Sequence, residues 1–315
     1  MKRTPRPVSG RRAALWGLIL ALAAPCIILG QSLDIPSKKW GLSFGNSQEF
    51  SGLRFNFRDG GVRRVTGVNI TLWQPRKDNQ EAVIEGLSLG LIPGGAHLRG
   101  IQFGLLGMAV TKSGTGINLG GLGLGAGEDL RGINLGGIGA GAGGSMTGLN
   151  IGGIGIGAGH NVTGITIGGI GAGAGDNMTG INIAGLGLGA GERLSGINLS
   201  GLAAGAGERM AGLTVCGLAA GAKEIIGLTL GGLAVGGEIL KGVHLAGGMV
   251  HVVKDGRLIG FAGSPFNYIR GSQTGLSIGI VNYAFHVNGL QLGLINIVRD
   301  NPRYLKVLPV FNTSF

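Results

Sequence analysis

The stretch GINIAGLGLGAGERLS, residues 180–195, contains the pattern that decides the fold. It begins like a β-strand, with apolar Ile181 and Ile183 on either side of a polar residue. The alternation then slips by one residue, and the next large side chains come at Leu186 and Leu188. Successive side chains of a strand point to opposite faces, so one straight strand cannot place both pairs on the same side. The chain is therefore expected to bend between the two pairs.

The same pattern recurs along the chain and defines a 16-residue repeat. We number its opening Gly as position 0. Positions 1 and 3 are then aliphatic, position 2 is Asn or Thr, positions 6 and 8 are mostly apolar or Ala, and position 14 is Leu, Met or Val. Regular units open at Gly116, Gly132, Gly148, Gly164, Gly180, Gly196, Gly212, Gly227 and Gly242, the last two one residue early. Looser units at Gly67, Gly100, Gly275 and Gly289 extend one array from roughly residue 40 to 300.

Two turn signals in each unit predict the fold. Small residues, mostly Gly, fill positions 4 and 5, and variable polar residues follow Gly at positions 11–13. With a corner at each, positions 1, 3, 6, 8 and 14 are expected to point inward. Each unit then forms one coil of an all-β, single-domain β-solenoid with coils of about 16 residues. Positions 0, 2, 4, 7 and 9 would point outward, and the Gly-rich positions 7 and 9 would form a flat face suited to close approach by another sheet.

An outer-membrane antiparallel β-barrel is the alternative fold. The terminal Phe315 and about sixteen repeated units suit a barrel of even strand number, with one strand and one turn per unit. The change of face inside each unit disfavours this alternative, because a lipid-facing strand keeps one apolar face. So does the lack of aromatic girdles between residues 116 and 260.

Position 2 supplies the candidate binding residues. Stacked amide and hydroxyl groups on an outward face would form a ladder along the coils. Such a ladder would bind a polysaccharide or ice, or associate with another surface. Its members are Asn118, Asn134, Asn150, Thr166, Asn182, Asn198 and Thr214.

The ends of the chain differ from its middle. Residues 1–30 have a basic start and an uncharged apolar run, as in a signal peptide cleaved between residues 23 and 30; an uncleaved membrane anchor is the alternative. Residues 31–115 are expected to form an N-terminal cap and irregular repeats, residues 116–241 the regular repeats, and residues 242–315 irregular repeats and a C-terminal cap. Without the leader the chain has 21 basic and 15 acidic residues, a net charge of +6, which gives no argument for nucleic acid.

No motif indicates catalysis, a metal or a cofactor. Ser43, Ser88 and Ser277 lie in G-x-S-x-G segments, but each fills the polar position 2 of a repeat, and the strand-to-helix turn of a hydrolase is not signalled. The turns lack the regular Asp of calcium-binding glycine repeats. The five His residues are scattered, and Cys216 is the only Cys after the leader, so no internal disulfide forms.

The basic run from Arg54 to Lys77 is interpreted as part of a soluble end cap, with contact to an anionic polymer or lipid as the alternative.

The last two units carry a resemblance. The segments GLSIGIVNYAFHVN (275–288) and GLQLGLINIVRDNP (289–302) resemble an uncharacterised family of bacterial surface-repeat proteins. Members of that family carry Gly-aliphatic-polar-aliphatic-Gly units after a signal peptide. The resemblance implies export and a surface location, and it supplies no activity and no functional residues.

Together these observations favour a non-enzymatic, exported structural repeat protein of the cell surface, outer membrane or periplasm of a bacterium. It would be a scaffold with a flat association face. The alternatives are an outer-membrane barrel or channel and a polysaccharide- or ice-binding solenoid. The partners left open are a membrane, a surface polymer and a second copy of the chain; nucleic acid is not expected.

Overall fold

The computed structural model describes residues 32–76 and 79–314, so the expected signal peptide lies outside the described residues. The described chain is all-β and contains no helix. It divides into two compact units, with the boundary between Gly127 and Glu128. This boundary coincides with neither of the repeat boundaries expected at residues 116 and 242. We call the part from residue 32 to 127 unit 1 and the part from 128 to 314 unit 2.

Unit 1 contains eight strands in the described residues. They are β1 (Ser32–Pro36), β2 (Trp40–Gly45), β3 (Glu49–Asn56), β4 (Arg64–Thr71), β5 (Val83–Gly90), β6 (Gly94–Gly104), β7 (Gly107–Gly120) and β8 (Gly123–Ala126). Strands β2 to β7 pair in parallel, each with the next, while the spacing between equivalent residues varies from coil to coil. The coils of unit 1 are therefore less regular in length than those that follow Glu128.

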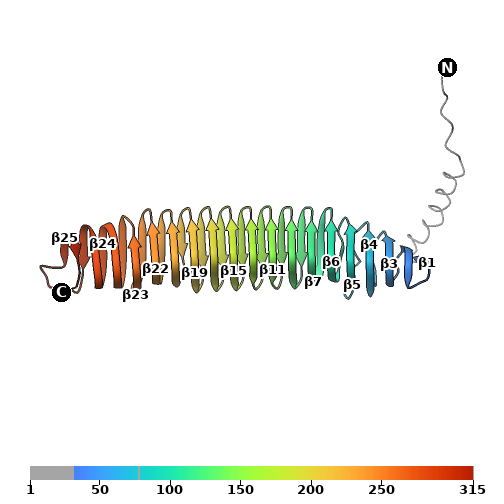
Figure 1. Cartoon of the computed structure of the whole chain (residues 1–315), viewed down its shortest axis with the longest axis horizontal. Helices are drawn as coiled ribbons and strands as arrows, with labels where there is room; N and C mark the ends of the chain where they lie inside the picture. The colour runs from blue at the N-terminus through green and yellow to red at the C-terminus, as the bar shows by residue number, and fades with distance from the viewer. Residues whose placement is uncertain (1–31, 77–78, 315) are drawn as a thin grey trace, which may run out of the picture. The chain divides into compact units, whose positions relative to one another are not determined.

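Unit 2 alternates long and short strands before its C-terminal coils, in which they merge. Its strands are β9 (Asp129–Gly136), β10 (Gly139–Ala142), β11 (Met146–Gly152), β12 (Gly155–Ala158), β13 (Val162–Gly168), β14 (Gly171–Ala174), β15 (Asn177–Ala184), β16 (Gly187–Ala190), β17 (Arg193–Ser200), β18 (Ala203–Ala206), β19 (Arg209–Cys216), β20 (Ala219–Gly221), β21 (Glu224–Gly231), β22 (Ala234–Ala246), β23 (Met249–Gly263), β24 (Phe266–Val298) and β25 (Val307–Asn312). Figure 1 shows the long strands β11, β15 and β19 pointing the same way.

Each regular coil is built from one long and one short strand joined by two tight corners. In the coil that opens at Gly180, β15 ends at Ala184, a two-residue bend follows, and β16 begins at Gly187. A second bend at Gly191 and Glu192 leads into the next long strand. Equivalent residues of neighbouring coils pair in parallel, as Ile165 does with Ile181. The fold is therefore the expected β-solenoid with coils of about 16 residues, and the antiparallel barrel is wrong because neighbouring strands are parallel.

The orientation of the repeat is the reverse of the expected one at positions 1, 2, 3, 4 and 6. Ile181, at position 1, is 38% exposed, and the position-3 residue Ile183 is half-buried on the same outer side. Asn182, at position 2, is completely buried. Leu186, at position 6, is 48% exposed on the corner, whereas Leu188, at position 8, is buried as expected. The expected inward direction of positions 1, 3 and 6 is therefore wrong, and so is the outward direction of positions 2 and 4.

The core is a narrow space between the long and short strands. It contains positions 2, 4, 8, 10 and 14 of each coil, and position 14 is buried as predicted, for example Leu194. Near the first corner the two walls almost touch, because a Cβ added at Gly152 would collide with the carbonyl oxygen of Gly155 and lie 3.0 Å from Cδ1 of Ile156. Small residues and a short amide therefore fill one wall, while Leu, Ile and Ala fill the other. Bulky Ile at positions 1 and 3 has no room inside.

The Gly at position 0 is required by the backbone. Gly180 has a φ of 121°, a conformation that L side chains rarely adopt, and a Cβ there would collide with the carbonyl oxygen of Gly164 in the previous coil. The position-0 glycines of neighbouring coils stack in register, as Gly164 and Gly180 do. This column lets consecutive long strands approach without a side chain between them.

Each unit contains an antiparallel strand, which pairs with its first or last parallel strand. In unit 1, β1 runs antiparallel to β2 and places Pro36 opposite Gly41. In unit 2, β25 runs antiparallel to the last turn of β24 and pairs Asn312 with Gln291. A parallel stack ends in a row of unpaired backbone groups, and these strands pair with part of that row.

Candidate functional site

The predicted binding ladder exists, but it lies inside the solenoid. The side chains of Asn118, Asn134, Asn150, Thr166, Asn182, Asn198 and Thr214 are all at most 1% exposed. Amides of neighbouring coils bond along the stack. Asn182 Nδ2 donates to Asn198 Oδ1 at 2.9 Å, and Asn134 Nδ2 donates to Asn150 Oδ1 at 2.8 Å. The ladder therefore holds coils together, and a polysaccharide or an ice surface outside the coil does not reach it.

The exposed surface of unit 2 is instead marked by aliphatic columns. We define the aliphatic face as positions 1 and 3 of the eight coils that open at Gly132 to Gly242, together with position 6 of the first seven of them, where every residue is Leu, Ile or Val. Its members are Ile133, Leu149, Ile165, Ile181, Ile197, Leu213, Leu228 and Val243; Leu135, Ile151, Ile167, Ile183, Leu199, Val215, Leu230 and Leu245; and Ile138, Ile154, Ile170, Leu186, Leu202, Leu218 and Leu233. All are exposed or half-buried. Parallel pairing stacks each member on its equivalent in the next coil, so the columns are continuous.

A strip of Gly borders the aliphatic face on the short strands. It comprises positions 7 and 9, and most of its glycines have neither a positive φ nor a close neighbour. A Cβ added at Gly157 or Gly189 would meet nothing within 4 Å, and one at Gly171 would make only an ordinary contact of 3.6 Å. The outward direction and bareness expected for these positions are confirmed.

Aromatic rings replace the Gly strip in the C-terminal coils. The rings of His251 and Tyr268 stack with centroids 5.7 Å apart, and Tyr268 and Tyr283 follow at 5.0 Å. Phe266 lies beside Tyr268 at 5.4 Å. These side chains are half-buried or exposed, so they form a short aromatic column on the outer surface of unit 2. Tyr268 and Tyr283 are 15 residues apart, which is the local coil length, and this spacing is the signal in the sequence for a column that the repeat pattern of the regular coils does not predict.

The charged residues of unit 2 occupy the opposite edge of the coil from the aliphatic corner. They lie mainly at positions 12, 13 and 15 and pair along the stack. Lys223 Nζ lies 2.6 Å from Glu208 Oε1, and Lys241 Nζ lies 2.7 Å from Glu224 Oε1. The hydrogen bond from Lys241 lowers the pKa of Glu224. The coil is thus amphipathic in cross-section, with a charged edge and an aliphatic edge.

The basic run of unit 1 is partly internal. Arg54 is fully buried at position 2, where Nη1 donates to Asp59 Oδ1 at 2.6 Å and to Asn69 Oδ1 at 2.7 Å. Arg64 pairs on the surface with Glu85 at 2.8 Å. Both arginines therefore have acidic partners within the chain, although the buried Nε of Arg54 has no hydrogen-bond partner among the described atoms.

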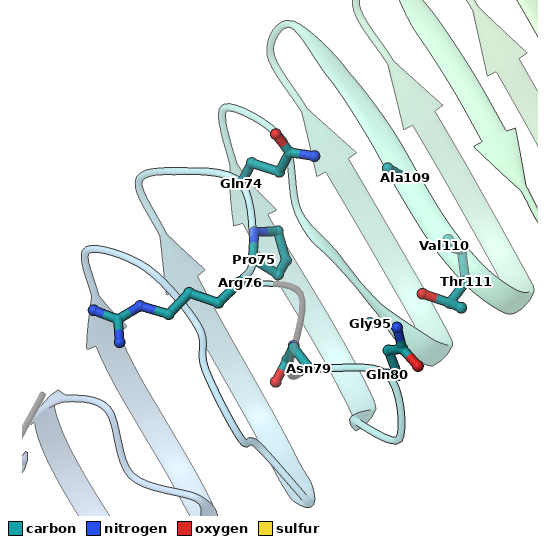
Figure 2. Close-up of a pocket in the computed structure, with 9 residues that line it drawn as sticks. All are labelled: Gln74, Pro75, Arg76, Asn79, Gln80, Gly95, Ala109, Val110 and Thr111. Carbon is teal, nitrogen blue, oxygen red and sulfur yellow. The ribbon is translucent and has the colours of Figure 1, made fainter.

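A shallow cavity of about 230 Å³ lies in unit 1 between the loop after β4 and strands β6 and β7. Its wall includes Pro75, Asn79, Val110 and Thr111. Figure 2 shows the Arg76 side chain extending away from Val110 and Thr111. The cavity brings together no acid, base or nucleophile set, so its geometry indicates no chemistry.

The remaining reactive side chains are dispersed. Ser43, Ser88 and Ser277 occupy position 2 of their coils, as the repeat predicts, and are buried there, contrary to the expected outward direction. Burial raises the pKa of the Cys216 thiol, which keeps it protonated at neutral pH. Within residues 32–76 and 79–314, no three His, Cys, Asp or Glu side chains gather as a metal site requires. The part of the chain described here also has no helix with the length and apolarity needed to cross a membrane.

Comparison of the sequence and structure with family models, curated proteins and solved structures finds no match.

Proposed function

We propose that the chain is a non-enzymatic, exported structural repeat protein of the bacterial cell surface or outer membrane, which acts as an association scaffold. The observation that carries this proposal is the aliphatic face of unit 2. From Ile133 to Leu245 it contains only Leu, Ile and Val, and the charged residues lie on the opposite edge. Soluble monomeric proteins rarely expose a contiguous apolar patch above a few hundred Å². A surface of this kind is typical of one that another surface covers.

The leader supports the exported location. Residues 1–30 have the basic start and apolar run of a signal peptide, and the terminal units resemble bacterial surface-repeat proteins. The charged edge would keep one side of the scaffold hydrated. The antiparallel strands β1 and β25 limit growth by addition of further strands.

Cell fractionation tests this location. The full chain and a variant that lacks residues 1–30 are expressed in bacteria, and protease is added to intact cells. We expect the full chain in the envelope and cleaved by the protease, and the shortened variant protected in the cytoplasm. A full chain that stays protected inside the cell would contradict the proposed function.

A polysaccharide-binding scaffold is a second candidate, favoured by the aromatic column of unit 2. Aromatic rings with a polar tip suit ligands that are apolar on one side and hydroxylated on the edge. Tyr268→Ala with Tyr283→Ala should then abolish retention on insoluble cell-surface polysaccharide, while Tyr304→Ala, which changes an exposed Tyr elsewhere in the unit, should not. Equal retention of both variants would remove this candidate.

A further inference from the structure

We propose that the aliphatic face of unit 2 binds a second copy of this chain, so that two copies pair face to face. This inference rests on the proposed function, because it names the partner of the association surface. It follows from three properties of the face: its composition, its area and the charges beside it.

The composition of the face is self-complementary. Each column presents the same kind of side chain once per coil, at the roughly 4.8 Å spacing of paired strands. Ile165, Ile181 and Ile197 of one copy would therefore meet a surface with the same repeat on the other copy. No charged or hydrogen-bonding side chain within the face would lose its water on contact, since every member is Leu, Ile or Val. Such a contact has no polar desolvation cost to offset.

The area of the face suits a stable dimer. Eight coils from Gly132 to Gly242 make columns about 38 Å long at the spacing of paired strands, and positions 1 to 6 span roughly 15 Å across. The columns are interrupted at Gly248, Gly263 and Pro265, and the exposed side chains of Ile278, Ile280, Leu290 and Leu294 resume them in the C-terminal coils. Two such faces would bury on the order of 1,200–1,600 Å², which is the range of specific protein interfaces.

The charges beside the face favour a protein partner over a lipid surface. Proteins that lie on anionic membranes have an excess of Lys and Arg next to the apolar surface. Residues 128–315 contain 11 Lys and Arg against 9 Asp and Glu. Several of these charges are already paired along the stack, as in Lys223–Glu208, Arg209–Glu224 and Lys241–Glu224. Between residues 128 and 245, beside the aliphatic columns, the polar edge therefore offers few free cations to lipid headgroups.

The geometry also limits the assembly to two copies. The face lies on one side of the coil, and the opposite edge is charged. An isologous contact between two equal faces uses both of them completely and closes the assembly. The antiparallel caps β1 and β25 oppose end-to-end growth of each unit.

Sedimentation velocity of the purified full chain over a range of concentrations tests the inference. The face variant carries Ile165→Asp, Ile181→Asp and Ile197→Asp. Its control carries Thr163→Asp, Thr179→Asp and Ser195→Asp, which add the same charge two residues earlier on the same outward sides of β13, β15 and β17. We expect the wild type and the control to sediment as dimers. The face variant should be monomeric, with a dissociation constant raised at least 100-fold and an unchanged β-sheet circular dichroism spectrum.

A milder variant keeps the test valid if three Asp residues prevent folding. Ile170→Ser, Leu186→Ser and Leu202→Ser change only the exposed corner column, and this variant should also be monomeric. A monomeric wild type, a larger assembly, or a folded face variant that dimerises as well as its control would overturn the inference. So would a wild type that is monomeric in solution and floats with phosphatidylcholine vesicles, an outcome that leaves the scaffold function standing. A dimer that is never exported would contradict the proposed function as an exported scaffold, but it would leave the proposed face-to-face dimer standing.

Discussion

Ile181 and Asn182 are adjacent in strand β15, yet the Ile is 38% exposed and the Asn is completely buried. The aliphatic side chain faces outward, and the amide bonds to the neighbouring coil inside. This inversion of the usual order determines both the stability of the coil and its outer surface.

The inversion predicts opposite tolerances at the two residues. Ile181→Asp should change the unfolding free energy of the chain in dilute solution by about 1 kcal/mol or less, because the side chain is on the surface. Asn182→Leu should cost about 3 kcal/mol, since it breaks the bond to Asn198 and overfills a narrow core. Denaturant titration of the two variants measures both values. A larger loss for Ile181→Asp than for Asn182→Leu would contradict the described orientation.

The amide ladder has a gap at Thr166 that one substitution should close. Among the described atoms, Thr166 Oγ1, Asn150 Nδ2 and Asn182 Oδ1 have no hydrogen-bond partner, although all three are buried. Thr166→Asn restores the residue type found in neighbouring coils and should raise the unfolding free energy by about 1–2 kcal/mol. Thr179→Asn, on the outer side of the next coil, is the control and should have no effect. Thermal or denaturant unfolding that shows Thr166→Asn to be destabilising would argue against the ladder.

The glycines at position 9 and at position 0 of the regular coils should respond in opposite ways to Ala. Gly157→Ala and Gly189→Ala place a methyl group in open space at ordinary φ, so each should stabilise the chain by about 0.5–1 kcal/mol. Gly180→Ala forces a side chain into a positive φ and into the Gly164 carbonyl, and it should cost at least about 2 kcal/mol. Denaturant unfolding midpoints of the three variants measure the difference in stability. Equal effects at the three sites would contradict the distinction between glycines that have room for a methyl group and glycines that need a positive φ.

His244 should make unit 2 sensitive to acid. It occupies the buried position 2, and burial lowers its pKa to about 4, opposed in part by the Lys241 carbonyl. Between the unfolded pKa of about 6.5 and pH 4 the unfolded chain holds the proton and the folded chain does not. The unfolding free energy should therefore fall by about 3 kcal/mol as the pH drops from 7 to 4, and this contribution should stay constant below pH 4.

His244→Asn should remove this part of the pH dependence, since Asn fits the column and does not titrate. His160→Asn, which changes an exposed His, is the control. Unfolding free energies measured at pH 7 and pH 4 give the difference for each variant. If the wild type and His244→Asn lose the same free energy over this range, the burial of His244 does not affect stability.

The sequence predicted the solenoid and its coil length because stacked coils need a fixed repeat, and the position-0 glycines display that repeat plainly. It also placed both turns, since Gly185 and the pair Gly191–Glu192 carry ordinary turn chemistry. The direction of the side chains could not be predicted in the same way. A period of two separates the two faces of a strand but does not say which is inside.

Hydrophobicity alone predicts that the aliphatic side chains lie inside. In this fold the narrow distance between the long and short strands decides instead which side chains fit in the core. The close approach of Gly152 to the facing Gly155 leaves no room for Ile at positions 1 and 3, whereas a short amide fits and bonds along the stack. The aliphatic face and the Asn ladder were thus found as patterns in the sequence but assigned to the wrong sides. The small residues at positions 4 and 10, such as Ala184 and Ala190, were the available signal for a thin core.

The central claim, that amides lie inside and aliphatic side chains outside, is tested most directly by thiol labelling of single-cysteine variants. In a Cys216→Ala background, Ile181, Asn182, Leu186 and Leu188 are replaced one at a time by Cys, and maleimide labelling of the folded chain is followed in dilute solution. The structure predicts fast labelling at residues 181 and 186 and protection at 182 and 188 until the chain unfolds. Fast labelling at residue 182 with protection at 181 would show that the coil is wound with the opposite side inward.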